Sequence, residues 1–367
     1  MDKKKVLIVM GGNCMGVGGI ESMVINYYRR LNKENLVVDF VFFGEGIGLY
    51  DEEIKSNGGR IFHLPIKSRH PLKSHLAMKK LLIREKYDIV HANLNAAGIC
   101  SALKIAKQCG IPVRISHAHS TNHGTQSKIR WILNDLARKR ITGYSTHNFA
   151  CSDLAGEWYY GSKPYEILPN AVETAKFAFD SSKRESVRAE MNVESDFVIG
   201  HVGNLGFPKN QSYLLEIFAA FKSACPKSKL WLVGEGEDLE ALNAKAKALK
   251  IENDVCFLGK RNDVDRLLQG MDAFVLPSFF EGFPVVVAEA VAADLPCFVS
   301  DSVTKTVVLS DRVEMLSIND SADLWAKKIM ECIGNVRRDN TSLMKQNGFD
   351  IDIAAERLNS FYLNGRF

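Results

Sequence analysis

Two glutamates and a proline in the last third of the chain have the types and spacing to bind an anionic sugar nucleotide. Glu281 and Glu289 are eight positions apart within GMDAFVLPSFFEGFPVVVAEAVA, residues 270–292. Pro284 lies between them and suits the first position of a helix, whose free N–H groups would hold a diphosphate beside Glu281. Glu289, just over one turn into that helix, would accept hydrogen bonds from a vicinal diol such as a ribose. A solvated helix charge is the competing interpretation.

Further candidate groups follow three other strands of the second half. The strands end in FVIGHVGNLGFPKN, VGEGED and VCFLGKRNDVDRLL, and the groups after them are Gly203, Asn204, Lys209, Gly234 and Arg261. A lysine at the start of a helix, as expected for Lys209, can neutralise a diphosphate leaving group without a metal ion. Main-chain groups near Arg261 can pair with a base edge. Each loop alone merely joins a strand to a helix, but all belong to one edge of one sheet, which favours a nucleotide site.

The glycine-rich segment GGNCMGVGGIES, residues 11–22, joins the first strand to a helix and includes Gly18 and Gly19. Its backbone N–H groups can face an anion or a sugar. A nicotinamide or flavin dinucleotide is the competing ligand, because a GxG pattern is followed about twenty residues later by Asp39. Two details disfavour it: Glu21 occupies the position of the third glycine, and Asp39 precedes its apolar run instead of following the strand.

Short apolar runs alternate with segments of helical periodicity, which predicts an α/β fold of two tandem, doubly wound parallel sheets. The expected strands are Val6–Met10, Val37–Phe43, Ile61–Leu64, Ile89–Ala92, Val113–Ile115, Phe149–Cys151, Phe197–Val202, Lys229–Val233, Val255–Phe257, Ala273–Leu276 and Cys297–Ser300. The expected helices lie near 19–31, 50–57, 72–85, 97–109, 125–141, 210–223, 237–249, 262–269 and 284–292. The pattern restarts after Asn170, so residues 1–170 form the predicted first domain. Ligands of such sheets bind beyond the carboxyl ends of the strands, which predicts a site in a cleft between two domains.

The composition is that of a globular protein, and 367 residues suffice for two domains. Hydrophobic residues make up 46% and charged residues 25% of the chain, without low-complexity tracts. No apolar stretch approaches the roughly 18 residues that cross a bilayer. The eight cysteines include no CxxC pair, which favours reduced thiols in a cytoplasmic protein over disulfides or a zinc site.

The charge of the chain is divided unevenly. Residues 1–170 carry 24 Lys and Arg against 14 Asp and Glu, whereas residues 171–367 carry 23 against 29. A basic first half suits an anionic membrane surface or a phosphate-bearing substrate, although uneven solvated charge explains it equally well. Nucleic acid is disfavoured as a partner, because the basic residues are not interleaved with aromatic residues in a recognisable binding module.

Taken together, these motifs resemble the retaining nucleotide-sugar glycosyltransferases of family 4, which have the GT-B architecture of two Rossmann-like domains. The motifs in the second half are His201-Val202-Gly203 with Lys209-Asn210, Val233-Gly234-Glu235-Gly236, Phe257-Leu258-Gly259, Pro277-Ser278, Glu281-Gly282-Phe283-Pro284 and Glu289-Ala290. Those in the first half are Gly18-Gly19-Ile20-Glu21, His117-Ala118-His119 and Ala150-Cys151-Ser152. The last two are similar to the members that build capsular or exopolysaccharide repeats. The resemblance implies a donor domain of residues 171–345 and a helix within 346–367 that returns to the first domain.

The resemblance also implies roles for particular residues. Glu281 would contact the donor sugar hydroxyls, Glu289 the ribose and Lys209 the diphosphate. His117 or His119 would line the reaction centre, and since alternation along a strand puts both on one side, spacing does not choose between them. A zinc site of His117, His119 and His123 is the weaker alternative, because no acidic or cysteine ligand lies nearby in sequence. No metal ion or cofactor is expected.

The donor implied is a nucleoside diphosphate sugar, most simply a UDP-sugar, and the acceptor a hydroxyl of a glycan or lipid-linked glycan. We expect a cytoplasmic enzyme that contacts the inner membrane face through its basic first domain. Three departures from the family pattern stand out: Asn204 where an arginine is usual, Ala171 where a glycine is usual, and Asp294 where a glycine is usual. They leave open a relative that binds nucleotide sugars without catalysis. A sugar-nucleotide epimerase of the same architecture is a second alternative, because it would share the diphosphate site.

Overall fold

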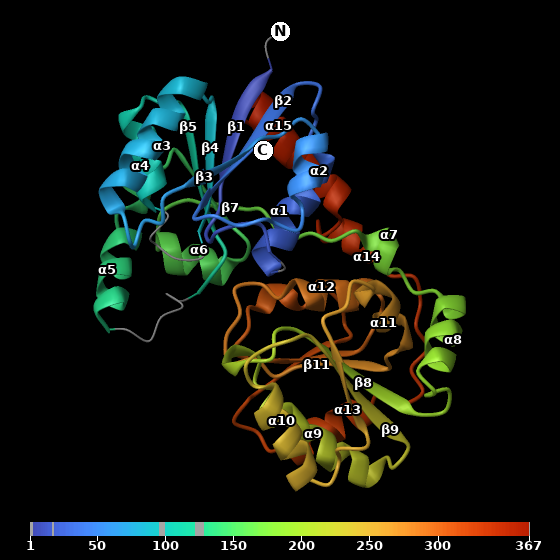
Figure 1. The fold of residues 1–367 in the computed structure, drawn as a ribbon. Helices are drawn as coiled ribbons and strands as arrows, with labels where there is room; N and C mark the ends of the chain where they lie inside the picture. The colour runs from blue at the N-terminus through green and yellow to red at the C-terminus, as the bar shows by residue number, and fades with distance from the viewer. Residues whose placement is uncertain (1–2, 17, 95–99, 122–127, 367) are drawn as a thin grey trace. The chain divides into compact units, whose positions relative to one another are not determined.

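The structure, a computed structural model, describes residues 3–16, 18–94, 100–121 and 128–366. The chain divides into two compact units (Figure 1). Unit 1 comprises Met1–Ala171 and Ile351–Phe367, and unit 2 comprises Val172–Asp350. Each unit is a parallel sheet with helices on its faces, so the predicted α/β, doubly wound architecture is confirmed.

The sheet of unit 1 has the strand order β3-β2-β1-β4-β5-β6-β7, and all neighbouring strands are parallel. Its strands are β1 (Lys4–Val9), β2 (Leu36–Phe43), β3 (Ile61–Leu64), β4 (Ile89–Leu94), β5 (Val113–Ala118), β6 (His147–Ala150) and β7 (Glu166–Ile167). Continuous apolar runs such as that of β1 form these strands because helices cover both faces of a parallel sheet. The order reverses between β1 and β4, which is where ligands of such sheets bind.

The helices of unit 1 include one from the far end of the chain. They are α1 (Gly19–Arg30), α2 (Asp51–Ser56), α3 (Pro71–Glu85), α4 (Cys100–Gln108), α5 (Lys128–Arg138), the 3-10 turn η2 (Ile141–Gly143), α6 (Asp153–Tyr160) and α15 (Ile351–Asn364). Helix α15 packs against α1. Its buried side chains recur at helical spacing, at Ile351, Ala354, Leu358 and Phe361. These four side chains join the hydrophobic core around β1 and β2, so the end of the chain completes unit 1.

The sheet of unit 2 has the order β10-β9-β8-β11-β12-β13, again with parallel neighbours. Its strands are β8 (Phe197–Val202), β9 (Ser228–Val233), β10 (Val255–Gly259), β11 (Ala273–Leu276), β12 (Cys297–Ser300) and β13 (Val313–Leu316). Its helices and turns are α7 (Thr174–Phe177), α8 (Ser181–Glu190), η3 (Phe207–Lys209), α9 (Gln211–Ala224), α10 (Leu239–Ala248), α11 (Val264–Gly270), α12 (Val285–Ala292), η4 (Lys305–Val307), α13 (Ala322–Met330) and α14 (Thr341–Gln346). The order reverses between β8 and β11, which gives this sheet the same kind of switch point.

The predicted strands all form, with ends that differ by a few residues, and the sequence reading missed the edge strands β7 and β13. The predicted starts of the helices near 97 and 125 lie outside the described residues. One prediction is wrong. Pro284 is not the first helical residue but the residue before α12, in an extended conformation with φ −77° and ψ 99°. Its carbonyl already accepts a hydrogen bond from the Val287 N–H, so the helix begins one residue later than expected.

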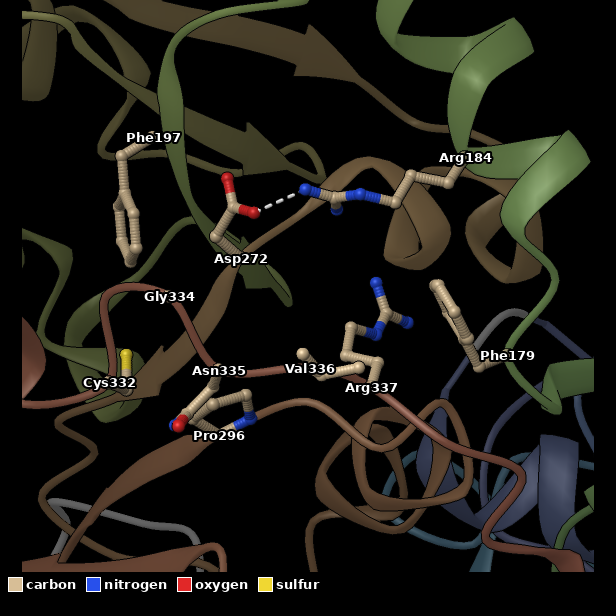
Figure 2. A pocket seen from close by; sticks show the side chains of 10 residues that line it. All are labelled: Phe179, Arg184, Phe197, Asp272, Pro296, Cys332, Gly334, Asn335, Val336 and Arg337. Carbon is tan, nitrogen blue, oxygen red and sulfur yellow. Dashed lines mark hydrogen bonds and ion pairs between the residues drawn. The ribbon is translucent and has the colours of Figure 1, made fainter.

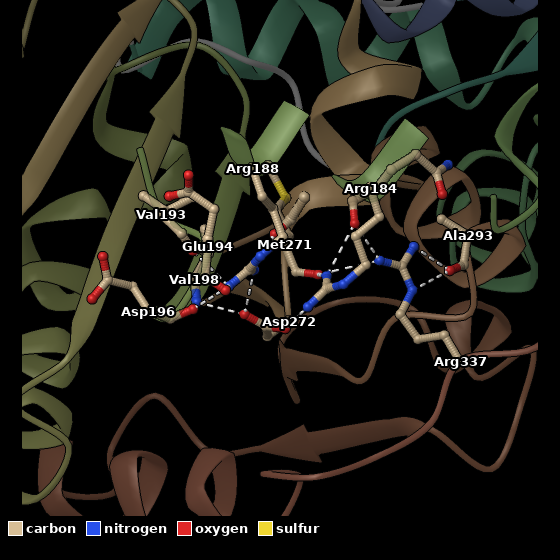
Figure 3. Close-up of polar contacts among 12 residues, drawn as sticks. Arg184, Arg188, Val193, Glu194, Asp196, Val198, Met271, Asp272, Ala293 and Arg337 are labelled. Atoms are coloured by element: carbon tan, nitrogen blue, oxygen red, sulfur yellow. Dashed lines mark hydrogen bonds and ion pairs between the residues drawn. The ribbon is translucent and has the colours of Figure 1, made fainter. Parts of the chain in front are cut away.

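Three arginines fasten the amino-terminal edge of the unit 2 sheet (Figure 3). Arg184 and Arg188 donate to the two carboxylate oxygens of Asp272, at 2.5 and 3.0 Å, just before β11. Arg337 donates to the main-chain carbonyls of Ala293, Gln269 and Met271. Arg184 and Arg188 also donate to the carbonyls at the C-terminus of α11. Cations stabilise a helix C-terminus, so the cluster joins α11, α8 and β11 into one edge.

Candidate functional site

The predicted donor-site residues of unit 2 lie in loops at the carboxyl edge of its sheet. These loops follow β8, β9, β10 and β11, which are neighbours in the sheet. Hydrogen bonds between main-chain groups tie them together: Gly203 N–H donates to Val233 O, Gly234 N–H to Gly259 O and Leu205 N–H to Glu235 O, at 2.8 to 2.9 Å. The loops therefore form a single surface, as the sequence predicted for the edge.

Gly234 is required by this close packing. Its φ is +141°, and a Cβ at this position would lie 2.0 Å from the carbonyl oxygen of Gly203. An L side chain rarely adopts such a φ, and no side chain fits so close to a main-chain oxygen. Gly203 is crowded in turn, since a Cβ there would lie 2.9 Å from Lys209 Cε. The glycines thus bring the main chain of two loops against the lysine.

Lys209 and Glu281, predicted separately from two loops, form an ion pair. The distance from Lys209 Nζ to Glu281 Oε1 is 2.6 Å, and the side chains are only 16% and 17% exposed. Ser278 Oγ also donates to Glu281, at 3.2 Å. The neighbouring rings of Phe207 and Phe279 stack at 4.8 Å. The structure therefore brings the proposed diphosphate-binding cation and the proposed sugar-binding carboxylate into direct contact.

His201 contacts β11 and, through Gln211, the loop after β8, a role that the sequence did not predict. It is fully buried, its Nδ1 lies 2.9 Å from Val275 O and its Nε2 lies 3.1 Å from Gln211 Nε2. Gln211 also donates to the carbonyl of Asn204. Burial, opposed by the Val275 carbonyl, lowers the pKa of His201 to about 4, so it stays neutral at physiological pH. Its position at the end of β8 was the available signal.

The remaining predicted residues of unit 2 lie at the edge with less direct support. The Asn204 side chain is exposed, and Arg261 is engaged by Asp263 in two hydrogen bonds of 2.7 Å. Gly282 lies in the loop before α12, and the ring of Phe283 is buried and stacks on Phe349 at 5.1 Å. Phe283 therefore packs within unit 2 and contributes main chain rather than side chain to the loop.

Glu289 lies within α12, where its environment disfavours the charged form. Burial raises its pKa to about 7, against the opposing influence of Lys176 on α7 and with a small contribution from Asp265 on α11. No described residue forms a hydrogen bond or ion pair with its carboxylate. A carboxylate kept partly protonated and unpaired suits a ligand that brings hydrogen-bond donors.

In unit 1, Gly18 precedes α1 and Gly19 begins it. The Glu21 carboxylate folds back over Gly18, where a Cβ would lie 2.5 Å from Oε2. Asp39 is fully buried and accepts hydrogen bonds from Arg60 and Tyr87. Because this carboxylate is committed to the fold, it does not serve as the ribose-binding acid of a dinucleotide site.

His117 and His119 lie on one side of β5, as the spacing predicted, with ring centroids 4.0 Å apart. A third histidine that the sequence reading missed, His91 on β4, joins them: its Nε2 lies 3.2 Å from His117 Nδ1. His91 Nδ1 lies 2.6 Å from the hydroxyl of Tyr362 on α15. His119 Nε2 lies 2.9 Å from Asn93 Oδ1 on β4. All three histidines are buried, and we name His91, His117 and His119 the histidine cluster.

Burial keeps the histidine cluster neutral. It lowers the pKa of His91 and of His119 to about 3, with a smaller contribution from His91 in the case of His119. The pKa of His117 is well below its ordinary value for the same reason and because of its two neighbours. Within the described residues no group of three His, Cys, Asp or Glu side chains is arranged to hold a metal ion. His123, the third ligand of the alternative zinc site, lies outside them.

A cavity of about 340 Å³ lies at the other, amino-terminal edge of the unit 2 sheet (Figure 2). Its walls include Phe197, the first residue of β8, Asp272, which precedes β11, and Pro296, which precedes β12. Arg184 and Arg337 also line it. None of the predicted site residues lines it. The cavity belongs to the arginine-fastened edge, whereas the glycine loops and Lys209 lie at the carboxyl edge of the same sheet.

Comparison with known proteins identifies the family. The model described as Glycosyltransferase Family 4 matches residues 17–176, and the model described as Glycosyl transferases group 1 matches residues 182–348. The putative glycosyltransferase EpsF of Bacillus subtilis (strain 168) is 33% identical over 338 residues, 89% of this chain and 87% of the relative. The chain therefore belongs to glycosyltransferase family 4.

Two further comparisons concern proteins with named ligands. UDP-Gal:alpha-D-GlcNAc-diphosphoundecaprenol alpha-1,3-galactosyltransferase of Escherichia coli is 26% identical over 95% of this chain and 94% of its own. The crystal structure of Anabaena HepE in complex with UDP-glucose matches with a TM-score of 0.73 and 18% identity, over 97% of this chain and 94% of that chain. The fold is accordingly GT-B. None of the helices in the described part of the chain is long and apolar enough to cross a membrane.

Proposed function

We propose that the protein is a retaining, metal-independent glycosyltransferase that moves a hexose from a UDP-sugar to a hydroxyl of a lipid-linked glycan in surface polysaccharide biosynthesis. Membership of glycosyltransferase family 4 supports the reaction class. A UDP-galactose donor and a diphosphoundecaprenol acceptor are named for the Escherichia coli relative, and UDP-glucose is bound by HepE. The sugar, the linkage and the acceptor of this chain belong to the proposal.

The observation that carries the proposal is the ion pair of Lys209 with Glu281. Both side chains are largely removed from water, so each charge depends on its partner. A diphosphate entering the edge offers the Lys209 ammonium a more highly charged anion. Glu281 would then lose its partner and accept hydrogen bonds from the hydroxyls of the donor sugar. One pair thus holds both groups ready for the two halves of the donor.

The same lysine would assist bond breaking. As the bond between the sugar carbon and the diphosphate oxygen breaks, its electrons leave with the diphosphate, whose charge rises. The acceptor oxygen forms the new bond to the sugar carbon and passes its proton to an oxygen of the departing diphosphate. Lys209 stabilises the growing charge more strongly than the ground state, and such differential binding accelerates the reaction.

The test is the transfer rate of Lys209→Ala and Glu281→Ala with UDP-sugars and a polyprenyl-diphosphate-linked acceptor. We expect each rate to fall at least about tenfold, equivalent to about 1.4 kcal/mol of transition-state stabilisation, and the double variant to lose less than the product because the residues act as a pair. The matched control is Lys328→Ala, which breaks the 3.0 Å ion pair with Glu314 elsewhere in unit 2 and leaves the rate unchanged. Unchanged rates in both site variants contradict the proposal.

The donor base is tested by melting temperature. A ligand that binds only the native state raises the melting temperature, and we expect UDP and UDP-sugars to do so more than GDP or ADP compounds. A preference for another base overturns the UDP assignment alone. Donor incubated without acceptor that returns an altered sugar identifies an epimerase, and binding without transfer to any acceptor identifies a non-catalytic relative.

The partner surface of unit 1 is the second part of the proposal. Helix α5 exposes Ile132 and Leu136, at 55% and 46%, and α3 exposes Leu72 and Leu76, at 79% and 64%. The same helices carry basic residues, Lys73, Lys79, Lys80 and Arg84 on α3 and Lys128 and Arg138 on α5, and residues 1–170 carry the excess of Lys and Arg. Apolar side chains among cations fit the headgroup region of an anionic membrane.

Vesicle sedimentation tests this surface. We expect the protein to bind phosphatidylglycerol vesicles more strongly than phosphatidylcholine vesicles, and Ile132→Ser with Leu136→Ser to weaken binding at least about threefold. The control is Ile333→Ser with Val336→Ser, two side chains of unit 2 that are 49% and 73% exposed. Equal loss in both variants would make the effect nonspecific and remove the assignment to α5.

A further inference from the structure

The histidine cluster contains two ring nitrogens without partners. His117 Nε2 and His119 Nδ1 are buried and form no hydrogen bond with any described residue. A buried polar atom left unpaired costs free energy and calls for an explanation. The partners of the other ring nitrogens determine what each of these two atoms offers, since a neutral imidazole carries its proton on one nitrogen only.

His119 is fixed by Asn93. The amide oxygen of Asn93 lies 2.9 Å from His119 Nε2, and an amide oxygen only accepts hydrogen bonds. Nε2 must therefore carry the proton, which leaves the lone pair of Nδ1 exposed to a ligand. The ring stays neutral at physiological pH because burial lowers its pKa to about 3, so the lone pair persists.

Tyr362 and His91 determine the tautomer of His117, and they make its unpartnered nitrogen a donor instead of an acceptor. Among the described residues, His91 Nδ1 is the one acceptor within hydrogen-bond distance of the Tyr362 hydroxyl. The phenol therefore donates to Nδ1, His91 carries its proton on Nε2, and that proton is donated to His117 Nδ1. His117 then carries its own proton on Nε2, which no described residue accepts.

The two histidines also differ in depth. His117 has no exposed surface, lies within β5 and packs beneath its neighbour, whereas His119 follows the strand at the carboxyl edge and keeps 7% exposure. The Nε2–H donor of His117 is enclosed in the fold, out of reach of a ligand. An unpartnered acceptor at the ligand-binding edge of the sheet is suited to a substrate.

We propose that His119, and not His117, meets the substrate, and that Asn93 is the positioning residue that holds His119 Nδ1 as an acceptor for a substrate hydroxyl. The inference rests on the proposed function, because the hydroxyl belongs to a sugar of the donor or acceptor. Tyr362 and His91 hold the ring of His117, which in turn contacts the ring of His119. A substrate hydroxyl that donates its hydrogen to Nδ1 is thereby held in one orientation.

The test in the free protein is the tautomer of each ring. In the full chain labelled with ¹⁵N-histidine, long-range ¹H–¹⁵N correlation distinguishes the protonated ring nitrogen from the bare one, and single substitutions assign the signals. We expect His91, His117 and His119 all to be protonated at Nε2 at neutral pH. In Asn93→Leu we expect His119 to populate both tautomers. A native His119 protonated at Nδ1, or an unaltered His119 in Asn93→Leu, overturns the inference.

The test in the working enzyme is the transfer rate of matched variants. We expect Asn93→Leu and His119→Leu to lower the rate at least about tenfold, and His119→Asn to recover part of the loss because its amide oxygen occupies the position of Nδ1. The control is Asn148→Leu on β6, which also deletes an amide that makes several hydrogen bonds. We expect it to keep the rate per folded molecule within about twofold.

Failure of this inference and failure of the proposed function are separable. UDP-sugar added to the labelled protein raises the melting temperature if the proposed function holds, whatever the tautomers are. The tautomers are read without any substrate, whatever the activity is. A native rate in His119→Leu together with a large loss in His117→Leu would exchange the two histidines and overturn the assignment.

Discussion

Two buried polar clusters, one in each unit, differ in how completely their atoms are paired. The arginine cluster of unit 2 directs its guanidinium groups at Asp272 and at main-chain carbonyls, and none of its described side-chain atoms is buried without a partner. The histidine cluster of unit 1 contains two ring nitrogens that have none. A fully paired network stabilises the fold, whereas an incompletely paired one costs stability and is expected where a ligand completes it.

The largest expected effect is a loss of stability of unit 1 at acidic pH. The folded pKa values of His91 and His119 are about 3, below the ordinary value of about 6.5 for an unfolded chain. Between these values the unfolded state binds protons and the folded state does not, so the stability that is present above about pH 6.5 is lost as pH falls. At pH 5 the loss is about 2 kcal/mol for each ring.

The measurement is urea unfolding at pH 7.5 and pH 5, read by pulsed hydrogen exchange at a common labelling pH. Peptides from β4 and β5 should lose protection at lower urea at pH 5, and more so than peptides from β8. Unit 2 has one comparable histidine, His201, whose pKa is lowered to about 4. The double variant His91→Gln with His119→Gln should flatten the pH dependence of unit 1. Equal acid sensitivity of wild type and double variant would show that the cluster is not neutral by burial.

The second effect is the stability of unit 2 without Arg337. This side chain is 9% exposed, and burial lowers its pKa to about 9. Arg337→Ala leaves the carbonyl of Ala293 unpaired and removes one of the two arginine donors to Gln269, and we expect a loss of about 3 kcal/mol in the free energy of unfolding. The transfer rate per folded molecule should stay within about twofold, because the cluster is at the edge opposite Lys209.

The control for that experiment is Arg338→Ala, the exposed neighbour, whose side chain makes no described contact and whose loss should cost under about 0.5 kcal/mol. Urea unfolding and transfer assays on the same samples separate stability from activity. A large fall in activity with little loss of stability in Arg337→Ala would reverse the contrast between the two clusters.

Much of unit 2 could be predicted from the sequence, because its candidate site residues follow closely after predicted strands. Strand ends in a parallel sheet share one edge, so Lys209 and Glu281 were expected on the same surface, although their direct ion pair depends on two loop conformations that no periodicity specifies. The start of α12 was predicted one residue early, since proline suits both the residue before a helix and its first residue. The strand β7 was missed because two residues carry no periodicity.

The histidine cluster shows what a sequence cannot supply. His117 and His119 were visible as a pair on one strand, but the choice between them depends on Asn93, His91 and Tyr362, which come from another strand and from a helix more than 240 residues away. A histidine inside the apolar run of β4 was the one local signal. Its partners follow from the strand order and from the return of α15, which pattern alone does not give.

The smallest expected effect tests whether Glu289 resembles the unpaired histidines or the paired arginines. Its folded pKa of about 7 lies above the value of about 4.3 for an unfolded chain, so the stability present below about pH 4.3 is lost as pH rises through 7. After allowance for partial exposure, Glu289→Gln should be more stable than the wild type by roughly 2 kcal/mol at pH 8 and by little at pH 4. The groups that face Glu289 are Lys176 and Asp265, so Lys176→Met is the control that removes the opposing charge and should raise the pKa of Glu289 further.

If the carboxylate serves the ribose diol, UDP binding should strengthen as pH rises through 7 in the wild type, and Glu289→Gln should lose both this dependence and about tenfold in affinity. Isothermal titration of UDP at pH 6 and pH 8 measures both. A pH-independent affinity that Glu289→Gln leaves unchanged would mean that the raised pKa reflects burial alone, and the carboxylate would then resemble neither cluster.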